Sequence, residues 1–319
     1  MVLQRERELM SVLVLGSLNA DLVTQVDRLP AAGETVIASD FTVHPGGKGL
    51  NQAAAAARFG SSVAMLGAVG QDEYGRFLQA QLDNEGVDRS GVGEVQAPTG
   101  RAIIEVDASG RNRIIVISGA NSSLDVEKVK SDLGKMNPKV ILAQLETPIE
   151  ITYEVFKSAK ERGIFTILNP APFQTLSSEL APFVDLIIPN EHEARLLTGV
   201  EIANVEDAYV AAGLLTKKGY REVIITLGDR GAILKRSNFQ RHVKPFSVSA
   251  IDSTAAGDAF CGTLAACVDR GMRTSDAIRY ASAAGAIATT VMGAVPSIPT
   301  YEETLGLINE CGSFEGEVK

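Results

Sequence analysis

The chain has few of the side chains that build metal centres, disulfide frameworks or histidine-dependent active sites. Among its 319 residues there are three histidines and three cysteines. Cys261, Cys267 and Cys311 form no CxxC pair, which argues against a zinc site and against a disulfide framework. They suit the role of small apolar fillers in a reducing compartment.

Long apolar runs and basic stripes are also missing. No run of about 18 apolar residues occurs, and the first ten residues, MVLQRERELM, lack the apolar core of a signal peptide. The net charge is −9, and the densest basic groups, Arg111–Arg113 and Lys235–Arg236, are too short for a nucleic-acid track. We therefore expect a cytoplasmic protein with neither a nucleic-acid nor a membrane partner.

The sequence matches none of the familiar catalytic and nucleotide-binding motifs. The only P-loop candidate, Gly47-Lys48, is followed by Gly49 and has Thr42 where the first glycine belongs. Gly91-Val-Gly93 does not continue into a dinucleotide fingerprint, and neither GxSxG nor HExxH is present. An enzyme that uses ATP would have to hold its phosphates in another way.

Short apolar segments alternate with helical patterns over most of the length. The apolar segments are Ser11–Gly16, Val63–Val69, Val140–Leu145, Ile164–Leu168, Val184–Ile188 and Val223–Leu227. The helical patterns are Gln52–Phe59, Tyr74–Glu85, Ile149–Arg162 and Ala208–Lys218, then Ala256–Arg270, Ser275–Thr290 and Tyr301–Glu310. Apolar runs without alternation indicate strands buried on both faces. The sequence thus predicts an α/β fold, with a doubly wound, mostly parallel sheet between helices.

Two segments, 22–43 and 100–117, interrupt this alternation with β-type sequence. In the second, Ala102–Val106 and Arg113–Ile117 flank a turn at Asp107–Gly110, which predicts a hairpin. We expect a single domain over residues 11–310, with the two segments forming a small β-flap that covers a cleft like a lid.

Asp252-Ser-Thr-Ala-Ala-Gly-Asp258 follows a β-type stretch, Phe246–Ile251, and opens a long helix. Such a helix N-terminus presents unpaired N–H groups and favours anions, and Gly257 permits a phosphate to approach closely. Asp258 would place a carboxylate beside that anion. The alternative is that Asp258 merely complements the helix dipole.

Two further segments are compatible with a binding site. In His44-Pro-Gly-Gly-Lys-Gly-Leu-Asn51, three glycines leave a backbone that can lie against a polyol, although an ordinary strand-to-helix turn would look the same. In Pro189-Asn-Glu-His-Glu193, a capping box between Asn190 and Glu193 explains the pattern without any ligand.

Together with Gly16-Ser-Leu-Asn-Ala-Asp21 and Gln144-Leu-Glu146, these segments resemble the ribokinase branch of the PfkB carbohydrate kinase family. The resemblance runs from Gly16 to Pro299. Its two specific motifs are Gly46–Ala53 and Thr254–Phe260.

The resemblance implies a role for particular residues. Asp258 would be the catalytic base, and the amides of Ala255, Ala256 and Gly257 would form an anion hole. The sugar would contact Asn19, Asp21, Gly46, Gly47, Lys48, Asn51, Glu146 and Asp258. The nucleotide would contact Asn190, Thr226, Gly228, Asp229, Gly257 and Ser282. Magnesium would be held through Asn190 and Glu193, and potassium by Asp252, Thr254, Ala288, Val291, Gly293 and Ser297. Family members often carry basic residues where this chain has Val291-Met292, so the potassium site rests on backbone carbonyls.

The implied reaction is ATP-dependent phosphorylation of the 5-hydroxyl of D-ribose, with ATP, Mg²⁺ and K⁺ as cofactors. Deoxyribose, a nucleoside such as pseudouridine, or a hexose are alternative acceptors. A non-catalytic sugar sensor is the alternative outside the enzyme class. Apolar positions Ile103, Ile115 and Ile117 of the flap predict a homodimer formed flap to flap.

Overall fold

The computed structural model describes residues 11–311, and these residues form two sheets. The larger sheet has nine strands in the order β13-β12-β11-β10-β9-β8-β1-β4-β5. Its strands are β1 (Val12–Leu15), β4 (Val63–Gly70), β5 (Asp88–Val95), β8 (Val140–Ala143), β9 (Phe165–Leu168), β10 (Leu186–Ile187), β11 (Glu222–Thr226), β12 (Ala232–Arg236) and β13 (Phe239–Val243). All neighbours from β5 to β11 are parallel, and the hairpin β12–β13 adds an antiparallel edge. The prediction of a mostly parallel sheet is confirmed.

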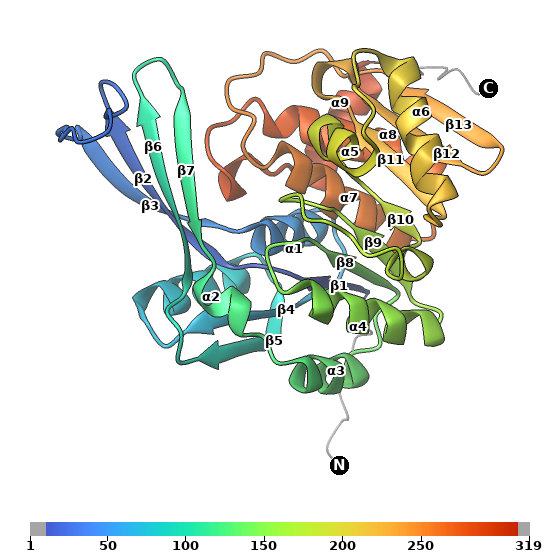
Figure 1. Cartoon of the computed structure of the whole chain (residues 1–319), viewed down its shortest axis with the longest axis horizontal. Helices are drawn as coiled ribbons and strands as arrows, with labels where there is room; N and C mark the ends of the chain where they lie inside the picture. Colours follow the sequence, from blue (N-terminus) through green and yellow to red (C-terminus); the bar gives the residue numbers. More distant parts are fainter. Residues whose placement is uncertain (1–10, 312–319) are drawn as a thin grey trace.

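Helices cover both faces of this sheet (Figure 1). They are α1 (Lys48–Arg58), α2 (Glu73–Asn84), α3 (Val126–Lys135), α4 (Ile149–Glu161), α5 (Glu191–Thr198), α6 (Val205–Lys217), α7 (Ala256–Asp269), α8 (Thr274–Ala288) and α9 (Tyr301–Glu310). Successive strand residues point to opposite faces, so Val12 and Val14 join a core with α1, α7 and α8. Leu13 and Leu15 join a second core with α3, α4 and α6.

The helices α1 and α7 cross at a very short distance because α7 carries a glycine at the crossing. A Cβ on Gly262 would lie 2.4 Å from the Gln52 carbonyl oxygen and 2.5 Å from Ala55 Cβ. Any larger residue would push α1 away from α7. This contact fixes the start of α1 against the first turn of α7, where Asp258 lies.

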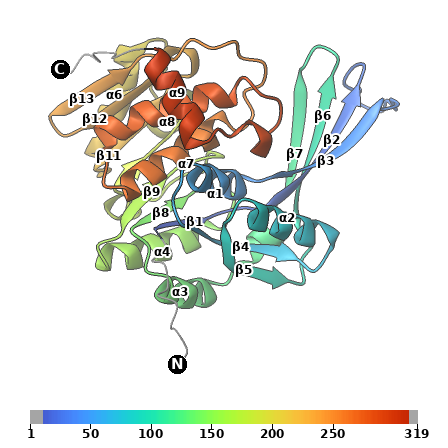
Figure 2. The same cartoon turned by 180° about the vertical axis from the view of Figure 1, so that it is seen from behind.

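The smaller sheet has the order β3-β2-β6-β7 and rises from the body beside α1 (Figures 1 and 2). Its strands are β2 (Asn19–Val26), β3 (Asp40–Gly46), β6 (Gly100–Asp107) and β7 (Asn112–Ile117). The hairpin expected around Asp107–Gly110 is present, because β6 pairs antiparallel with β7. The strands β2 and β3 reach further toward the body than expected, starting at Asn19 and ending at Gly46.

Other expectations from the sequence need correction. Phe246–Ile251 is not a strand, because β13 ends at Val243 and the chain then leaves the sheet edge to run beside α8. There it is tied by the Ile251 N–H, which donates to the Thr289 carbonyl at 2.8 Å. Four elements were not anticipated at all: α3, β5, β12 and β13. They are short or lie at a sheet edge, where polar residues dilute the apolar pattern.

All three cysteines are free thiols, and Cys261 and Cys267 are buried. Within residues 11–311, no helix combines the length and the apolar character needed to cross a membrane.

Candidate active site

The chain turns sharply into α7 through a strained residue. Ala255 has φ = 59°, a left-handed conformation that a non-glycine residue adopts at an energetic cost. The first N–H that bonds back along the helix is that of Ala259, which donates to the Ala255 carbonyl at 2.8 Å. The N–H groups of Gly257 and Asp258 precede it and belong to the unpaired first turn. Gly257 is exposed, and a Cβ there would meet no atom within 4 Å, so this helix end is open to a ligand.

Asp258 itself faces inward and is only 7% exposed. Its Oδ2 accepts a hydrogen bond from Asn51 Nδ2 at 3.0 Å, and its Oδ1 accepts one from Gln52 Nε2 at 2.9 Å. The side chain of Lys48 lies in the field of this carboxylate. Asp258 raises the pKa of Lys48, and burial, which acts in the opposite direction, does not cancel this effect. A carboxylate held beside an open helix N-terminus can act as a general base toward a ligand bound there.

Two further carboxylates lie close to Asp258. Glu146 accepts hydrogen bonds from the Ser17 hydroxyl and, at 3.2 Å, from the Lys48 N–H. Asp21 lies over Gly46, where a Cβ would come within 2.1 Å of its Oδ2. Burial, with the negative charges of Glu146 and Asp258, raises the pKa of Asp21 to about 7.

Several polar atoms around these carboxylates lack partners. Within residues 11–311, the Asp21 carboxylate accepts no hydrogen bond, and Asn51 Oδ1 is buried without a partner. Asn19 is held by Asn121, whose Nδ2 donates to Asn19 Oδ1 at 2.8 Å. A ligand with several hydroxyl groups, such as a polyol, can donate hydrogen bonds to these acceptors.

The Asn190–Glu193 segment forms the capping box expected from its sequence. The Glu193 N–H donates to Asn190 Oδ1 at 2.8 Å, and the Asn190 N–H donates to Glu193 Oε2 at 2.9 Å. A cap at the surface would be exposed, yet Glu193 is 6% exposed. Burial raises its pKa, with Asp258 adding to the effect, while the Asn190 N–H and Lys48 oppose it. Glu193 therefore shares the electrostatic field of Asp258 and Lys48 as well as capping α5.

The donor set does not suit a directly ligated divalent cation. Within residues 11–311, no group of three or more His, Cys, Asp or Glu residues could hold a metal ion. Magnesium commonly keeps several waters and binds through one or two carboxylates together with substrate phosphates. Glu193 fits a magnesium ion of that kind.

The predicted nucleotide residues come from the capping box, from the end of β11 and the turn that follows it, and from α8. Thr226 bridges Asn190 in a parallel pairing, so the segment after β11 lies beside the capping box. Gly228 and Asp229 then begin a short 3₁₀ turn in which Gly228 has φ = 55°. Ser282 lies on α8, where its hydroxyl donates to the Ile278 carbonyl at 2.8 Å.

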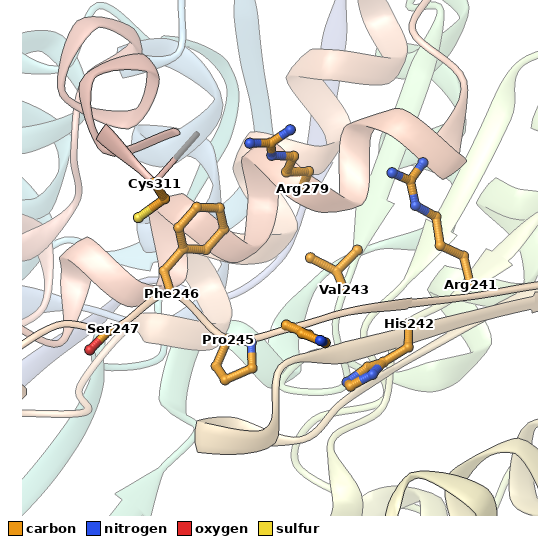
Figure 3. Close-up of a pocket in the computed structure, with 9 residues that line it drawn as sticks. Arg241, His242, Val243, Pro245, Phe246, Ser247, Arg279 and Cys311 are labelled. Atoms are coloured by element: carbon orange, nitrogen blue, oxygen red, sulfur yellow. The ribbon is translucent and has the colours of Figure 1, made fainter. Parts of the chain in front are cut away.

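A cavity of about 180 Å³ opens beside α8 (Figure 3). Val243, Pro245 and Phe246 give it an apolar wall, and Arg279 of α8 lines it as well. Arg279 and Ser282 are three residues apart and share one face of the helix. The cavity is lined neither by Ser282 nor by the carboxylates Asp21, Glu146 and Asp258.

Three of the six residues predicted to hold potassium, Asp252, Thr254 and Gly293, are tied together by hydrogen bonds. Asp252 Oδ1 accepts from the Thr254 N–H at 2.9 Å and from its hydroxyl at 2.6 Å, and Asp252 Oδ2 accepts from the Gly293 N–H at 2.8 Å. Burial alone would raise the pKa of Asp252, but these bonds outweigh it and lower the pKa. Ala288 ends α8, Val291 is exposed, and the Ser297 hydroxyl donates to the Ala294 carbonyl at 2.7 Å.

Five residues at the site received no role from sequence reasoning. They are Ser17, Gln52, Asn121, Gln144 and Asn169. Ser17, Gln52 and Gln144 stand inside the motifs that carried the resemblance, so their position was a usable signal. Asn121 and Asn169 stand in no motif, and only the folded chain brings them to the site.

The chain is similar to known carbohydrate kinases. The family model described as "pfkB family carbohydrate kinase" matches residues 10–301. The ribokinase of Haemophilus influenzae is 42% identical over 294 residues, covering 92% of this chain and 96% of that protein. The deoxyribokinase of Salmonella typhimurium is 35% identical over 299 residues, with coverage of 92% and 97%.

Solved structures agree as well. The Arabidopsis thaliana ribokinase, solved in complex with ribose and ATP, superimposes with a TM-score of 0.89 at 31% identity and covers 94% of this chain and 98% of its own. The shared fold, the family model and the identity to these relatives lead to one conclusion: the chain belongs to the PfkB family of carbohydrate kinases.

Proposed function

We propose that this protein transfers the γ-phosphoryl group of ATP to the 5-hydroxyl of D-ribose. The observation that carries the proposal is the set of unpaired acceptors, Asp21 and Asn51 Oδ1, next to a buried carboxylate at an open helix N-terminus. Ribose offers vicinal hydroxyls to these acceptors. The related enzymes named for ribose, one of them solved with ribose and ATP, give independent support.

In the proposed mechanism, Asp258 accepts the proton of the 5-hydroxyl as its oxygen attacks the γ-phosphorus. The bond from that phosphorus to the bridging oxygen breaks, and ADP leaves. The amides of Ala255, Ala256 and Gly257 would face the charge on the transferred group, for which the Ala256 N–H would give up its 3.3 Å hydrogen bond to the Ser253 carbonyl. Each well-placed donor contributes roughly 3 kcal/mol. Lys48 lies close enough to Asp258 for its pKa to respond to that carboxylate, and it adds positive charge to the same region.

The nucleotide would extend from the α7 N-terminus along α8. Gly285 packs against the first turn of α7, since a Cβ there would lie 3.1 Å from the Ala256 carbonyl oxygen. At about 1.5 Å per residue, Arg279 lies roughly 9 Å further along α8. The base of ATP would thus point toward the cavity with the apolar wall of Val243, Pro245 and Phe246. Asn190, Thr226, Gly228, Asp229 and Ser282 would line the path between.

Magnesium, when bound, would neutralise the phosphates of ATP. Glu193 and Asn190 would hold it through water.

Potassium would lie between the Asp252–Thr254 turn and the carbonyls of Ala288, Val291 and Gly293, with Ser297 nearby. There it would fix the orientation of the anion-hole amides before ATP binds, which is supported by the existing bond from the Gly293 N–H to Asp252. Activity should then rise well above the sodium level when potassium is supplied. Equal rates in potassium, sodium and a bulky organic cation at matched ionic strength would remove the ion from the mechanism.

The smaller sheet would act as a lid over the sugar, and through it the protein would form a homodimer. Asp21 belongs to the face of β2 that turns to the site, so its neighbour Leu22 points the other way. Leu22 pairs with Val43 and Ile103, and Ile103 pairs with Ile115, which gives an apolar stripe on the outer face. Ile103 is 36% and Ile115 61% exposed, and such a stripe favours pairing with a second copy. Sedimentation that finds only monomer at micromolar concentration would contradict the dimer.

A location in the cytoplasm is part of this proposal. The use of ATP and the presence of three free cysteines support it.

The function is tested by measuring ADP release over a panel of sugars and nucleosides. D-ribose should be the best acceptor, and 2-deoxyribose should have a kcat/KM lower by on the order of 10², because the missing hydroxyl leaves buried acceptors unpaired. Similar values for the two sugars, or a preference for deoxyribose, pseudouridine or a hexose, would assign the enzyme to another branch of the family. Ribose binding without ADP release would indicate a sugar sensor.

A further inference from the structure

Two consecutive residues of α1 hold the Asp258 carboxylate, one on each oxygen. Asn51 uses its Nδ2 for this bond, and its Oδ1 is buried without a partner. Gln52 is different: it is fully buried and approaches Asp258 from inside the protein. Its Nε2 donates to Asp258 Oδ1 at 2.9 Å and to Asn169 Oδ1 at 3.1 Å, so both of its hydrogens are used.

Gln52 belongs to a chain of buried amides that ends in the backbone. Gln144 Nε2 donates to Gln52 Oε1 at 2.6 Å, and Asn169 Nδ2 donates to the Ile188 carbonyl at 2.9 Å. Gln144 is fully buried and Asn169 is 9% exposed. Gln144 follows β8, and Asn169 follows β9. Gln52 is therefore seated against two adjacent strands of the central sheet, which are among the most rigid supports that the fold offers.

The direction of these hydrogen bonds is dictated by the charge on Asp258. An ionised carboxylate only accepts, so Gln52 must turn its NH₂ group toward it. The Gln52 carbonyl oxygen then faces Gln144, which must donate in turn. Gln144 Oε1 is left buried with no partner, in the space where a Cβ on Gly16 would lie 2.1 Å away.

This arrangement is costly for a purely structural element. A buried acceptor without a partner is unfavourable, whereas apolar residues of the same shape could fill the same volume without that cost. The chain of amides is explained if its purpose is to present an NH₂ group to Asp258.

We propose that Gln52 is a positioning residue, seated by Gln144 and Asn169, which fixes the rotation of the Asp258 carboxylate toward the sugar hydroxyl. With Asn51 as its only donor, the Asp258 carboxylate could rotate about its Cβ–Cγ bond. With both oxygens held, the remaining lone pairs point to the side where the substrate binds. This inference rests on the proposal that Asp258 is the base.

The test is a double-mutant cycle of Gln52→Met with Asp258→Asn, read as the single-turnover rate of phosphoryl transfer to ribose. Methionine keeps the length of glutamine but donates no hydrogen bond. In the otherwise unchanged enzyme, Gln52→Met should lower the rate about 10- to 100-fold, because a slightly misplaced base is inefficient. The KM values for ribose and ATP should change less than the rate does. In the Asp258→Asn background, the same substitution should have almost no further effect.

Two controls separate positioning from general damage. Thr274 of α8 donates a buried hydrogen bond to Glu222 of β11, outside the proposed machinery. Thr274→Val removes this bond and should lower the Tm without a comparable loss of rate. If Gln52→Met does not fold, Gln144→Met removes the donor to Gln52 from one step further away. It should give a smaller loss of rate that again disappears in the Asp258→Asn background.

The outcomes distinguish a failure of the positioning role of Gln52 from a failure of the assignment of Asp258 as the base. An equal fold-loss from Gln52→Met in both backgrounds, or no loss in either, would overturn the positioning role. If Asp258→Asn itself turned over ribose at a nearly normal rate, the assignment of the base would fail first.

Discussion

The sugar side and the nucleotide side of the proposed site differ in how far the protein has arranged its polar groups in advance. On the sugar side, Glu146, Asn19 and Asp258 are held by hydrogen bonds from residues far away in the sequence. On the nucleotide side, Gly228, Asp229 and Gly257 are exposed. A small neutral sugar brings little binding energy of its own, so its pocket must be rigid and complementary. ATP brings charge, and an open helix end already favours it.

The largest effect is expected at Asp258, where the sugar side and the nucleotide side meet. Asp258→Asn should lower kcat by roughly 10²- to 10⁴-fold, the range usual for loss of a general base. ATP affinity should hardly change, because the amides of the α7 N-terminus remain. Steady-state kinetics, with calorimetry using a non-hydrolysable ATP analogue, would measure both quantities. Near-normal turnover would leave Asp258 as a residue that only complements the helix dipole.

Two glycine substitutions should separate the two sides. Gly46→Ala would displace Asp21, since the new Cβ would lie 2.1 Å from Asp21 Oδ2. Losing a charged hydrogen bond costs about 1.5–3 kcal/mol, so kcat/KM for ribose should fall roughly 10- to 100-fold while the KM for ATP is kept. Gly257→Ala meets no atom and should stabilise the helix by up to about 1 kcal/mol, yet it should raise the KM for ATP. If both variants affected the same substrate, the division into two sides would be wrong.

The crowding of carboxylates on the sugar side should be visible in the stability of the ligand-free protein. The folded-state pKa of Asp21, about 7, lies above its ordinary value of 3.8. Between these two values the folded state binds more protons than the unfolded state, so stability falls as the pH rises through this window. Asp21→Asn has no titrating carboxylate at this position, so it should not lose stability in this way as the pH rises. Its Tm should match the wild type near pH 4, exceed it by a few degrees at pH 7, and gain no more above that.

Melting curves of both proteins from pH 4 to pH 9 would measure the effect. A Tm difference that did not change with pH would show that neither burial nor the charges of Glu146 and Asp258 raise the pKa of Asp21. Added ribose should reduce the difference, because its hydroxyls bind the wild-type carboxylate.

The smallest effect is expected at Glu193, where capping and catalysis overlap. Glu193→Gln keeps the shape of the cap, so stability should fall by only about 1 kcal/mol. If Glu193 also holds magnesium, the concentration of magnesium needed for half-maximal rate at fixed ATP should rise. A magnesium titration beside a thermal melt separates the two roles, and an unchanged titration curve would leave Glu193 a cap alone.

Prediction from the sequence succeeded where the signal is local. The alternation of apolar runs and helices gave the parallel sheet, and the turn at Asp107–Gly110 gave the hairpin of the smaller sheet. Prediction failed where the secondary structure depends on which elements pack beside the segment. Phe246–Ile251 has strand-like residues but no neighbouring strand to pair with, and β5, at the sheet edge, is too polar to be recognised. The motifs led to Asp258, Asn51 and Glu146, but they did not indicate which atoms of these residues would be free.

The sequence by itself determined the family, the alternation of the main buried strands with helices, and the open, glycine-containing start of α7, because each depends on residues that are adjacent in the chain. Only the tertiary structure decided the surroundings of those residues. Gln52 and Asn169 are 117 positions apart, and Asn51 and Asp258 are 207 apart, yet each pair forms a hydrogen bond. The pKa of Asp21 likewise depends on Glu146 and Asp258, which reach it only through the packing of strands and helices. Electrostatic energy and hydrogen bonding depend on distance in space, and the linear sequence does not contain that distance.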